Sequence, residues 1–370
     1  PLLVRLFPDV PAGHPAHGAM VMNMAANMLG LGNAATPLGL RAMALLESLN
    51  PRPGTASNAM VTFLTINTAS IQIIPTTAIA ILAVAGSSSP TAIVPAAFLA
   101  TVVAATVGIL AAKLLQRLPI FAAGATAATA EAAPDQAATE IAGGDEVLDV
   151  ERISVEPLAP WKRGLLAAYI LFFLGLWVMM IAWPFPDLAV KPPVMRALFA
   201  ASILAVPFLL SFFPLYAALR GVEVYSQFAT GAREAFDVAL RIIPYLVAML
   251  VAIRLLREAG IIEAVTNFLR PILGLVAFPP ELVPMVLLRP LSGSATQGVF
   301  VDLANTYGGD AFISKLAGAI YGSTETTFYV IAVYFGSVKV FRTRHAILAG
   351  LTADTVAVVT AFIFCRMMFG

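Results

Sequence analysis

The residue best placed for chemistry in this chain is Glu325, within the polar cluster Gly322-Ser323-Thr324-Glu325-Thr326-Thr327. It is the only charged residue between Lys315 and Lys339, in sequence that is otherwise apolar. A charge at the bilayer centre costs roughly 2.5–3.5 kcal/mol on insertion scales, so an acid kept there is usually functional. Glu325, with Ser323 and Thr324, is therefore a candidate to bind a cation, take up a proton or hold a substrate donor. The alternative is that it bonds its own neighbours and an opposing helix, and only locks the fold.

A second cluster lies in the N-terminal part and carries no charge. It reads Asn67-Thr68-Ala69-Ser70-Ile71-Gln72. Asn67, Thr68, Ser70 and Gln72 are candidates to bind the same solute or ion from the opposite half. The alternative is that they bond neighbouring helices, an interaction worth about 0.6–2 kcal/mol each.

Each cluster follows a segment rich in small residues. Asn33 lies in the first of these segments, Gly30 to Pro37, while Ser292 and Ser294 lie in the second, Leu291 to Gly298. Glycine and proline break helices, and broken helices expose N–H and C=O groups that bind ions. Close helix packing through small residues is the competing interpretation.

Two further charged residues are candidates. Arg289 precedes Pro290 at the second break, where it could neutralise an acid, meet an anionic ligand or extend to the membrane interface. Asp354 lies in the last apolar stretch and is a second intramembrane carboxylate. It could instead pair with Arg289 or Arg344.

Signatures of other protein classes are missing from the sequence. There is no P-loop, dinucleotide fingerprint, HExxH or nucleophile elbow, so we expect no enzyme activity and no cofactor. The three histidines show no ligand spacing, and the methionines near residue 24 favour a flexible core lining over a soft-metal site. Basic residues form no cluster, which argues against nucleic-acid binding.

Composition predicts an all-α polytopic membrane protein. Hydrophobic residues make up 59% of the 370 residues, and charged residues only 12%, against about 25% in a typical soluble domain. No charge occurs between Arg52 and Lys113, which is room for two crossings with a turn at 86–90. The predicted helical segments are 20–31, 41–54, 56–84 interrupted at Pro75, 92–115, 164–183, 194–213, an amphipathic 223–241, 242–256, a re-entrant 284–301, 312–338 and 346–369.

An acidic segment divides the chain. Residues 119–160 are rich in alanine and hold eight acids against one base, Arg152. We expect this linker to be disordered, because it cannot bury enough apolar area. Basic residues on both sides of it predict a cytoplasmic location in a protein of the inner (plasma) membrane. The flanking regions are 1–118 and 161–370.

These two regions share one pattern. Each has a small-residue break, then a Thr/Ser cluster, an apolar stretch, a turn and a last span. Asn33 corresponds to Ser294, and Thr68 and Ser70 correspond to Ser323 and Glu325. We therefore predict two related repeats with discontinuous or re-entrant helices, inverted or parallel, with a site at their interface. The alternative is that any two membrane hairpins look alike.

The motifs resemble a known family. Met22 to Pro37 and Asn67 to Thr77 are similar to spore maturation protein A, whereas Arg289 to Ser294 and Gly322 to Val330 are similar to spore maturation protein B. The resemblance implies a fusion of the two and a Gate-domain, permease-like fold. The N-terminal helices expected of an A protein are missing, and the chain begins at Pro1, so we expect upstream sequence.

Together these observations predict a membrane carrier of a small polar solute or ion in the lipid bilayer. A non-transporting scaffold for envelope or spore maturation is the alternative, and an enzyme acting on lipid-linked precursors is a weaker third. Substrate, coupling ion and oligomeric state, a homo-oligomer among the options, stay open.

Overall fold

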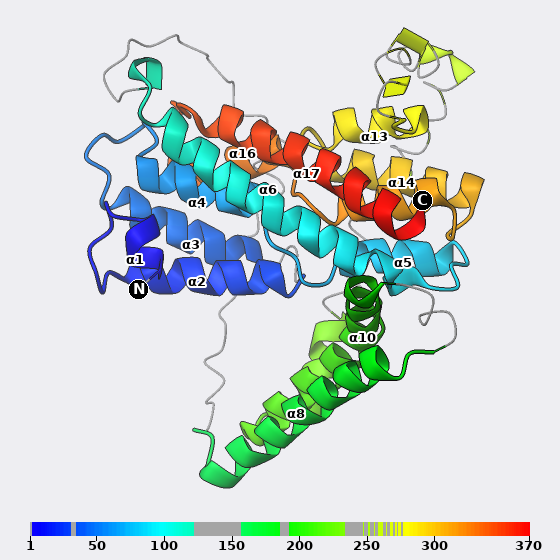
Figure 1. Cartoon of the computed structure of the whole chain (residues 1–370). Helices are drawn as coiled ribbons and strands as arrows, with labels where there is room; N and C mark the ends of the chain where they lie inside the picture. Colours follow the sequence, from blue (N-terminus) through cyan, green and yellow to red (C-terminus); the bar gives the residue numbers. More distant parts are fainter. Residues whose placement is uncertain are drawn as a thin grey trace.

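The protein is built from helices. The computed structural model describes residues 2–30, 35–121, 157–185, 192–233 and 277–370, together with separate positions between 247 and 274. Throughout these residues the only β-type pairing is an isolated bridge between Thr55 and Arg342. The predicted all-α fold is confirmed, and Figure 1 shows its arrangement.

The N-terminal region forms a helical hairpin, a broken helix and one long helix. Ser57 caps the first part of the broken helix by accepting a hydrogen bond from the amide of Met60 at 3.3 Å. Pro75 lies immediately before the second part, where its missing N–H leaves no backbone bond to lose. The elements are α1 (Leu2–Leu6), α2 (Pro15–Met28), α3 (Ala35–Glu47), α4 (Asn58–Thr68), α5 (Thr76–Val84), η2 (Pro90–Ile93), α6 (Val94–Leu115) and η3 (Pro119–Phe121).

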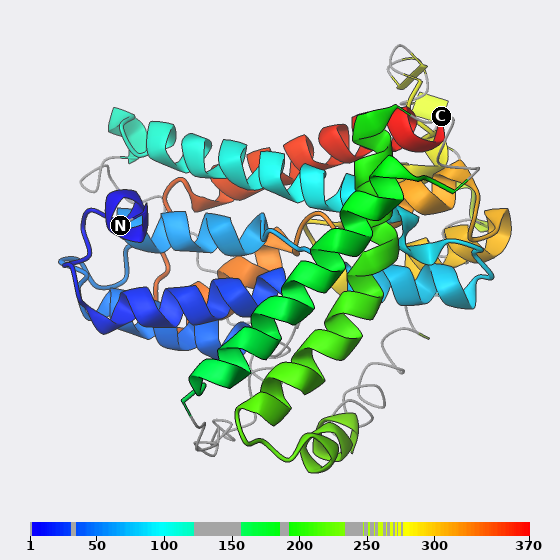
Figure 2. The same ribbon diagram turned by 60° about the horizontal axis from the view of Figure 1, so that its bottom comes forward.

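The C-terminal region begins with a separate pair of helices and then follows the same order of elements. Its elements are α8 (Pro160–Ala182), α10 (Pro193–Leu219), η4 (Pro280–Leu282), α13 (Val283–Leu288), α14 (Gly293–Tyr307), α15 (Phe312–Tyr321), α16 (Thr327–Ser337) and α17 (Ala346–Phe369). The pair formed by α8 and α10 extends away from the other helices, as Figures 1 and 2 show. It contacts them mainly through α10 at η2 and α6.

Within the residues that the structure describes, three helices are long and apolar enough to cross a membrane: Pro90–Leu115, Pro160–Ala182 and Ala346–Phe369. A fourth candidate is the pair Pro193–Ala205 and Pro207–Leu219, which is bent by 48°. The bend occurs where a proline removes a backbone donor inside the helix. The chain is a multi-pass membrane protein.

Some predicted boundaries are wrong. The segment expected at 41–54 is α3, which begins at Ala35 directly after the glycine break and ends at Glu47. The single span expected at 312–338 is two helices, α15 and α16, and at the break between them the amide of Glu325 donates to the carbonyl of Thr68 instead of to its own helix. The span expected at 194–213 continues to Leu219. Asn33, most of the linker, the end of 223–241 and most of 242–256 lie outside the described residues.

The long helices α6 and α17 form the centre of the fold. They pack against each other through small residues, including Ala104, Ala105, Ala353 and Ala357. At Gly108 a Cβ atom would lie 3.0 Å from the Cβ of Ala353, so the helix axes approach closely there. Small residues are the usual means of close helix association in membranes. The two broken helices pack against this pair.

The two broken helices lie side by side and run in opposite directions. The first part of one, α4, packs against α16, and the second part, α5, packs against α15. Loops hold the two regions together at both ends. At one end the amide of Ser88 donates to the carboxylate of Asp310 at 2.9 Å, and at the other the amide of Ala56 donates to the carbonyl of Arg342 at 2.9 Å.

Candidate functional site

The candidate site lies where the two broken helices meet. The amide of Glu325, in the second break, donates to the carbonyl of Thr68, at the end of α4, at 2.8 Å. A Cβ atom on Gly322 would lie 2.5 Å from the Cβ of Pro75, so the two breaks are in close contact. Residues from both sequence clusters are therefore brought together, as the pattern predicts.

Each break also receives the tip of the helical hairpin that precedes it in the chain. The amide of Ile73 donates to the carbonyl of Met28, at the end of α2, at 3.0 Å. In the other region, the amide of Phe328 donates to the carbonyl of Pro290 at 3.0 Å. Backbone groups that the breaks leave free are thus bonded by protein, which lipid could not do.

The carboxylate of Glu325 has a partner in the other region. Gln72 donates from Nε2 to Oε1 of Glu325 at 3.2 Å. Its sequence neighbour Ser323 bonds elsewhere, donating to the carbonyl of Ile320 at 3.0 Å. Glu325 is only partly buried, whereas Ser323 is fully buried. The acid therefore joins the two regions instead of closing a local turn.

Arg289 is buried and bonds to the second broken helix. It donates from Nη2 to the carbonyl of Tyr321 at 2.9 Å and from Nη1 to Oγ1 of Thr326 at 3.4 Å. Its guanidinium lies 4.8 Å from the centre of the Tyr321 ring, within cation–π range. With only 4% of its surface exposed, it does not extend to the interface. It holds the end of α15 and adds positive charge beside the break.

Asp354 lies on α17 and faces the start of α16. Thr327 donates from Oγ1 to Oδ2 of Asp354 at 2.5 Å. The alternative of a pair with Arg344 does not hold, because that guanidinium bonds the carbonyls of Phe121 and Ala56 and the side chain of Asn58. Arg289 is likewise occupied by α15 and by the start of α16. Among the described residues, Asp354 thus has a hydroxyl partner and no ion pair.

The members of the neutral cluster have different environments. Asn67 makes three hydrogen bonds: its Oδ1 accepts from Asn27 at 2.9 Å and from the Tyr334 hydroxyl at 3.2 Å, and its Nδ2 donates to the carbonyl of Phe63 at 3.0 Å. Only one N–H of this side chain is left for a ligand. Gln72 instead reaches Glu325, and the hydroxyls of Thr68 and Ser70 are buried.

Ser292 and Ser294 lie at the tip of the second hairpin. The Oγ of Ser292 accepts from the amide of Ala295 at 3.2 Å and so caps α14. It lies 3.3 Å from the Oγ of Ser294, and both serines are partly buried. A Cβ atom on Gly293 would lie 3.0 Å from Oγ1 of Thr326, which places the tip against the second break.

Four buried oxygens around the junction have no hydrogen-bond partner among the described residues. They are Oγ1 of Thr68, Oγ of Ser70, Oγ1 of Thr324 and Oδ1 of Asp354. Their residues are between 0% and 6% exposed. Buried polar groups nearly always find a partner, so a concentration of free ones points to a ligand that binds there.

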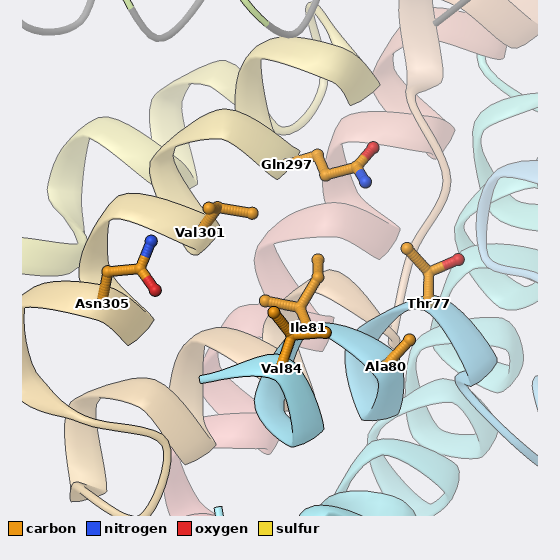
Figure 3. Close-up of a pocket in the computed structure, with 7 residues that line it drawn as sticks. All are labelled: Thr77, Ala80, Ile81, Val84, Gln297, Val301 and Asn305. Carbon is orange, nitrogen blue, oxygen red and sulfur yellow. The ribbon is translucent and has the colours of Figure 1, made fainter. Parts of the chain in front are cut away.

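Sequence reasoning missed residues on both sides of the junction. Asn23, Asn27 and Tyr334 form the network around Asn67, and the spacing of the two α2 asparagines on one helix face was the available signal. A pocket of about 240 Å³ between α5 and α14 was also missed. Figure 3 shows the side chains that line it: Thr77, Ala80, Ile81, Val84, Gln297, Val301 and Asn305. No group of three or more His, Cys, Asp or Glu side chains that could hold a metal occurs in the part of the chain that the structure describes.

Comparisons with known proteins agree with this architecture. Residues 239–341 match the Gate family, which is described as nucleoside recognition. Spore maturation protein B of Bacillus subtilis (strain 168) is 40% identical over 169 residues, which is 46% of this chain and 95% of that protein. Spore maturation protein A of the same organism is 48% identical over 103 residues, which is 28% of this chain and 53% of that protein. No solved structure matches the chain significantly.

Proposed function

Because the chain belongs to the spore maturation protein family, with similarity to both its A and B proteins, we propose that it is a membrane carrier for a small polar solute or ion. The observation that carries the proposal is the junction of two oppositely directed broken helices at the Thr68 carbonyl and the Glu325 amide. Paired broken helices of this kind form transport sites in many secondary transporters.

The order of elements supports an inverted repeat. The hairpin α2–α3, the broken helix α4–α5 and the long helix α6 correspond in order to α13–α14, α15–α16 and α17. The loop contacts also correspond, since the α5–α6 turn meets the α14–α15 turn while the α16–α17 turn meets the α3–α4 turn. In this proposal the hairpins are re-entrant. Residues 1–118 and 161–370 are the two repeats, and 119–160 is a cytoplasmic linker in a plasma-membrane protein.

The proposed site uses side chains from both repeats. Glu325 and Gln72 present a carboxylate and an amide to the solute, and the second hairpin tip, which carries the two serines, contacts Thr326, the residue after Glu325. Arg289 offsets the charge of the acid from the far side of the break. The family description suggests nucleosides as the first solutes to test, since carboxylates and amides can bond ribose hydroxyls and base edges.

A scaffold without transport is the competing function. It predicts that the junction is dry and that its polar groups serve only packing. The bonded network of Asn67 fits that role, but the free oxygens of Thr68, Ser70 and Thr324 do not. The two functions differ in whether water reaches the junction.

Thiol labelling separates these two functions. Cys365 is first replaced by alanine, and single cysteines are introduced by Ser294→Cys and Ser70→Cys in membrane vesicles. A carrier predicts that a small membrane-impermeant methanethiosulfonate reagent modifies both positions, with Ala353→Cys in the packed α6–α17 contact as the protected control. Complete protection of Ser294→Cys and Ser70→Cys would support the scaffold.

Transport is then tested in proteoliposomes with radiolabelled uridine and adenosine. Replacement Glu325→Gln keeps the shape of the side chain and removes its charge. We expect uptake to fall by about tenfold or more, the scale of one lost charged hydrogen bond. Equal uptake by the variant at every pH would remove Glu325 from the site.

A further inference from the structure

We infer that Asp354, Thr68 and Thr327 form a second site, which binds a sodium ion. The inference deepens the proposed carrier by naming its coupling ion, and in that respect it rests on the proposed function. The three residues come from α17, α4 and α16, so the site joins both halves of the molecule. It is distinct from the Glu325–Gln72 pair at the same junction.

The two threonines both contact α17 at Gly350, one turn before Asp354. A Cβ atom on Gly350 would lie 2.7 Å from Cγ2 of Thr327 and 3.6 Å from Cγ2 of Thr68. Thr327 also donates to Oδ2 of Asp354 at 2.5 Å. The glycine leaves the room that both threonines occupy against α17. These contacts place Thr327 on Asp354 and Thr68 one helical turn from it.

Two oxygens of these residues are buried and have no hydrogen-bond partner within the described part of the chain. Oδ1 of Asp354 and Oγ1 of Thr68 have no hydrogen-bond partner among the described residues. Asp354 is 6% exposed and Thr68 is 0% exposed. Leaving a carboxylate oxygen unpaired in a buried environment is costly, and a bound cation removes that cost.

The donors select the kind of cation. All are oxygens, which suits a hard ion and argues against soft metals. A single carboxylate balances a single positive charge, whereas Ca²⁺ takes six to eight oxygens and usually several carboxylates. The C-terminal end of α4, where Thr68 lies, carries partial negative charge and favours a cation. Sodium fits this set.

Thr68 connects the ion to the solute site. Its carbonyl accepts the hydrogen bond from the amide of Glu325 at 2.8 Å, while its side chain contacts α17 beside Asp354. An ion held by Thr68 and Asp354 fixes the end of α4 against α17. That in turn fixes the backbone that positions Glu325. Binding of the ion and of the solute is therefore expected to be coupled.

The test is direct binding of ²²Na⁺ to the purified full chain in detergent, measured by displacement with unlabelled NaCl against choline chloride. The wild type is expected to bind sodium saturably. Asp354→Asn should weaken that binding by about tenfold or more, and Thr68→Val should weaken it as well. Thr355→Val, at an exposed position on α17, is the matched control and should bind like the wild type.

Three results would overturn the inference: no saturable sodium binding by the wild type, unchanged binding by Asp354→Asn, or a junction that responds to pH but not to sodium. If Asp354→Asn does not fold, Thr68→Val decides in its place. Glu325→Gln should keep sodium binding while losing uptake. If the protein binds sodium but shows no uptake, the sodium site is supported and the carrier function is rejected. If uptake occurs and does not depend on sodium, the carrier function is supported and the sodium site is rejected.

Discussion

The molecule contains two helix interfaces, each between one helix of residues 1–118 and one of residues 161–370, and only one of them is filled. We refer to the contact between α3 and α16 as the filled interface and to the contact between α5 and α14 as the open interface. In the filled interface Tyr334 lies directly against Gly39, and its hydroxyl bonds Asn23 and Asn67. In the open interface a pocket of about 240 Å³ remains, with Gln297, Thr77 and Asn305 among its lining residues.

Side-chain size explains the difference. The filled interface combines a large aromatic ring on α16 with a glycine on α3, so the ring occupies the space between the helices. The open interface is lined by Ala80 and Val84 on α5 and by Val301 on α14, and no aromatic side chain is among the described residues that line its pocket. The interface between α3 and α16 is thus sealed, whereas the interface between α5 and α14 is accessible. For a carrier, the open interface is the side on which a solute would approach the breaks.

The largest effect is expected from adding volume to the filled interface. A Cβ atom on Gly39 would lie 2.1 Å from Cε1 of Tyr334, so Gly39→Val must displace the ring. Overpacking of this kind typically destabilises by 1–3 kcal/mol, and we expect about 3 kcal/mol here because the displaced ring also leaves its hydrogen bonds. The measurement is the melting temperature in detergent, together with the yield of folded protein.

Ala80→Leu is the matched control for this comparison, because it adds the same number of carbon atoms to the open interface. The pocket has room for them, so we expect little change in melting temperature. Equal destabilisation by both replacements would show that the two interfaces are packed alike, contrary to the structure.

A smaller effect is expected from the hydroxyl of Tyr334. Tyr334→Phe keeps the ring in place and removes the hydrogen bonds to Asn23 and Asn67, which are 0% and 3% exposed. Asn23 keeps its bond to the carbonyl of Ala35, and Asn67 keeps its bond from Asn27. The expected cost is therefore that of two lost hydrogen bonds, about 1–2 kcal/mol. Tyr329→Phe on the same helix, where the side chain is 39% exposed, should change the melting temperature little. A Tyr334→Phe protein as stable as the wild type would mean that ring packing alone seals this interface.

Much of the fold could be predicted from local sequence. The long helix α17 has the predicted bounds, and the break after Thr68 was expected from Pro75. The break at 322–326 was missed, because its only helix breaker is Gly322 and the polar cluster stands between two apolar stretches that read as one span. At that break the amide of Glu325 bonds the carbonyl of Thr68, which is distant in sequence. The local sequence does not reveal which distant residues will be hydrogen-bond partners.

The types of residue at the candidate site could be predicted from the sequence, but which of these residues bond to each other could not. An acid alone in apolar sequence identified Glu325, and its pairing with Gln72 needed the opposite direction of the two broken helices. The network of Tyr334 and the pocket beside Gln297 were not foreseen. Both depend on which side chains from different halves face each other, and periodicity within one helix does not specify this.

The smallest change in stability is expected on acidification, and it should come from the loop contacts beside the filled interface. His345 is 0% exposed at the start of α17, where burial and the charges of Arg344 and Lys113 lower its pKa to about 4. In the unfolded chain His345 takes up a proton near pH 6.5, whereas in the folded protein it does so only near pH 4. Stability is therefore complete above pH 6.5 and declines as the pH falls, by about 1–2 kcal/mol between pH 6.5 and 5.

The loop contact beside the open interface should respond differently. The amide of Ser88 and the hydroxyl of Ser87 lower the pKa of Asp310, so its carboxylate stays charged and loses its stabilising effect only at pH values below the usual aspartate range. Melting temperatures between pH 7.5 and 4.5 should fall for the wild type and for Asp310→Asn but stay more nearly level for His345→Leu. A decline of the same size in His345→Leu would show that acid acts elsewhere, and that the filled interface is no more sensitive to acid than the open one.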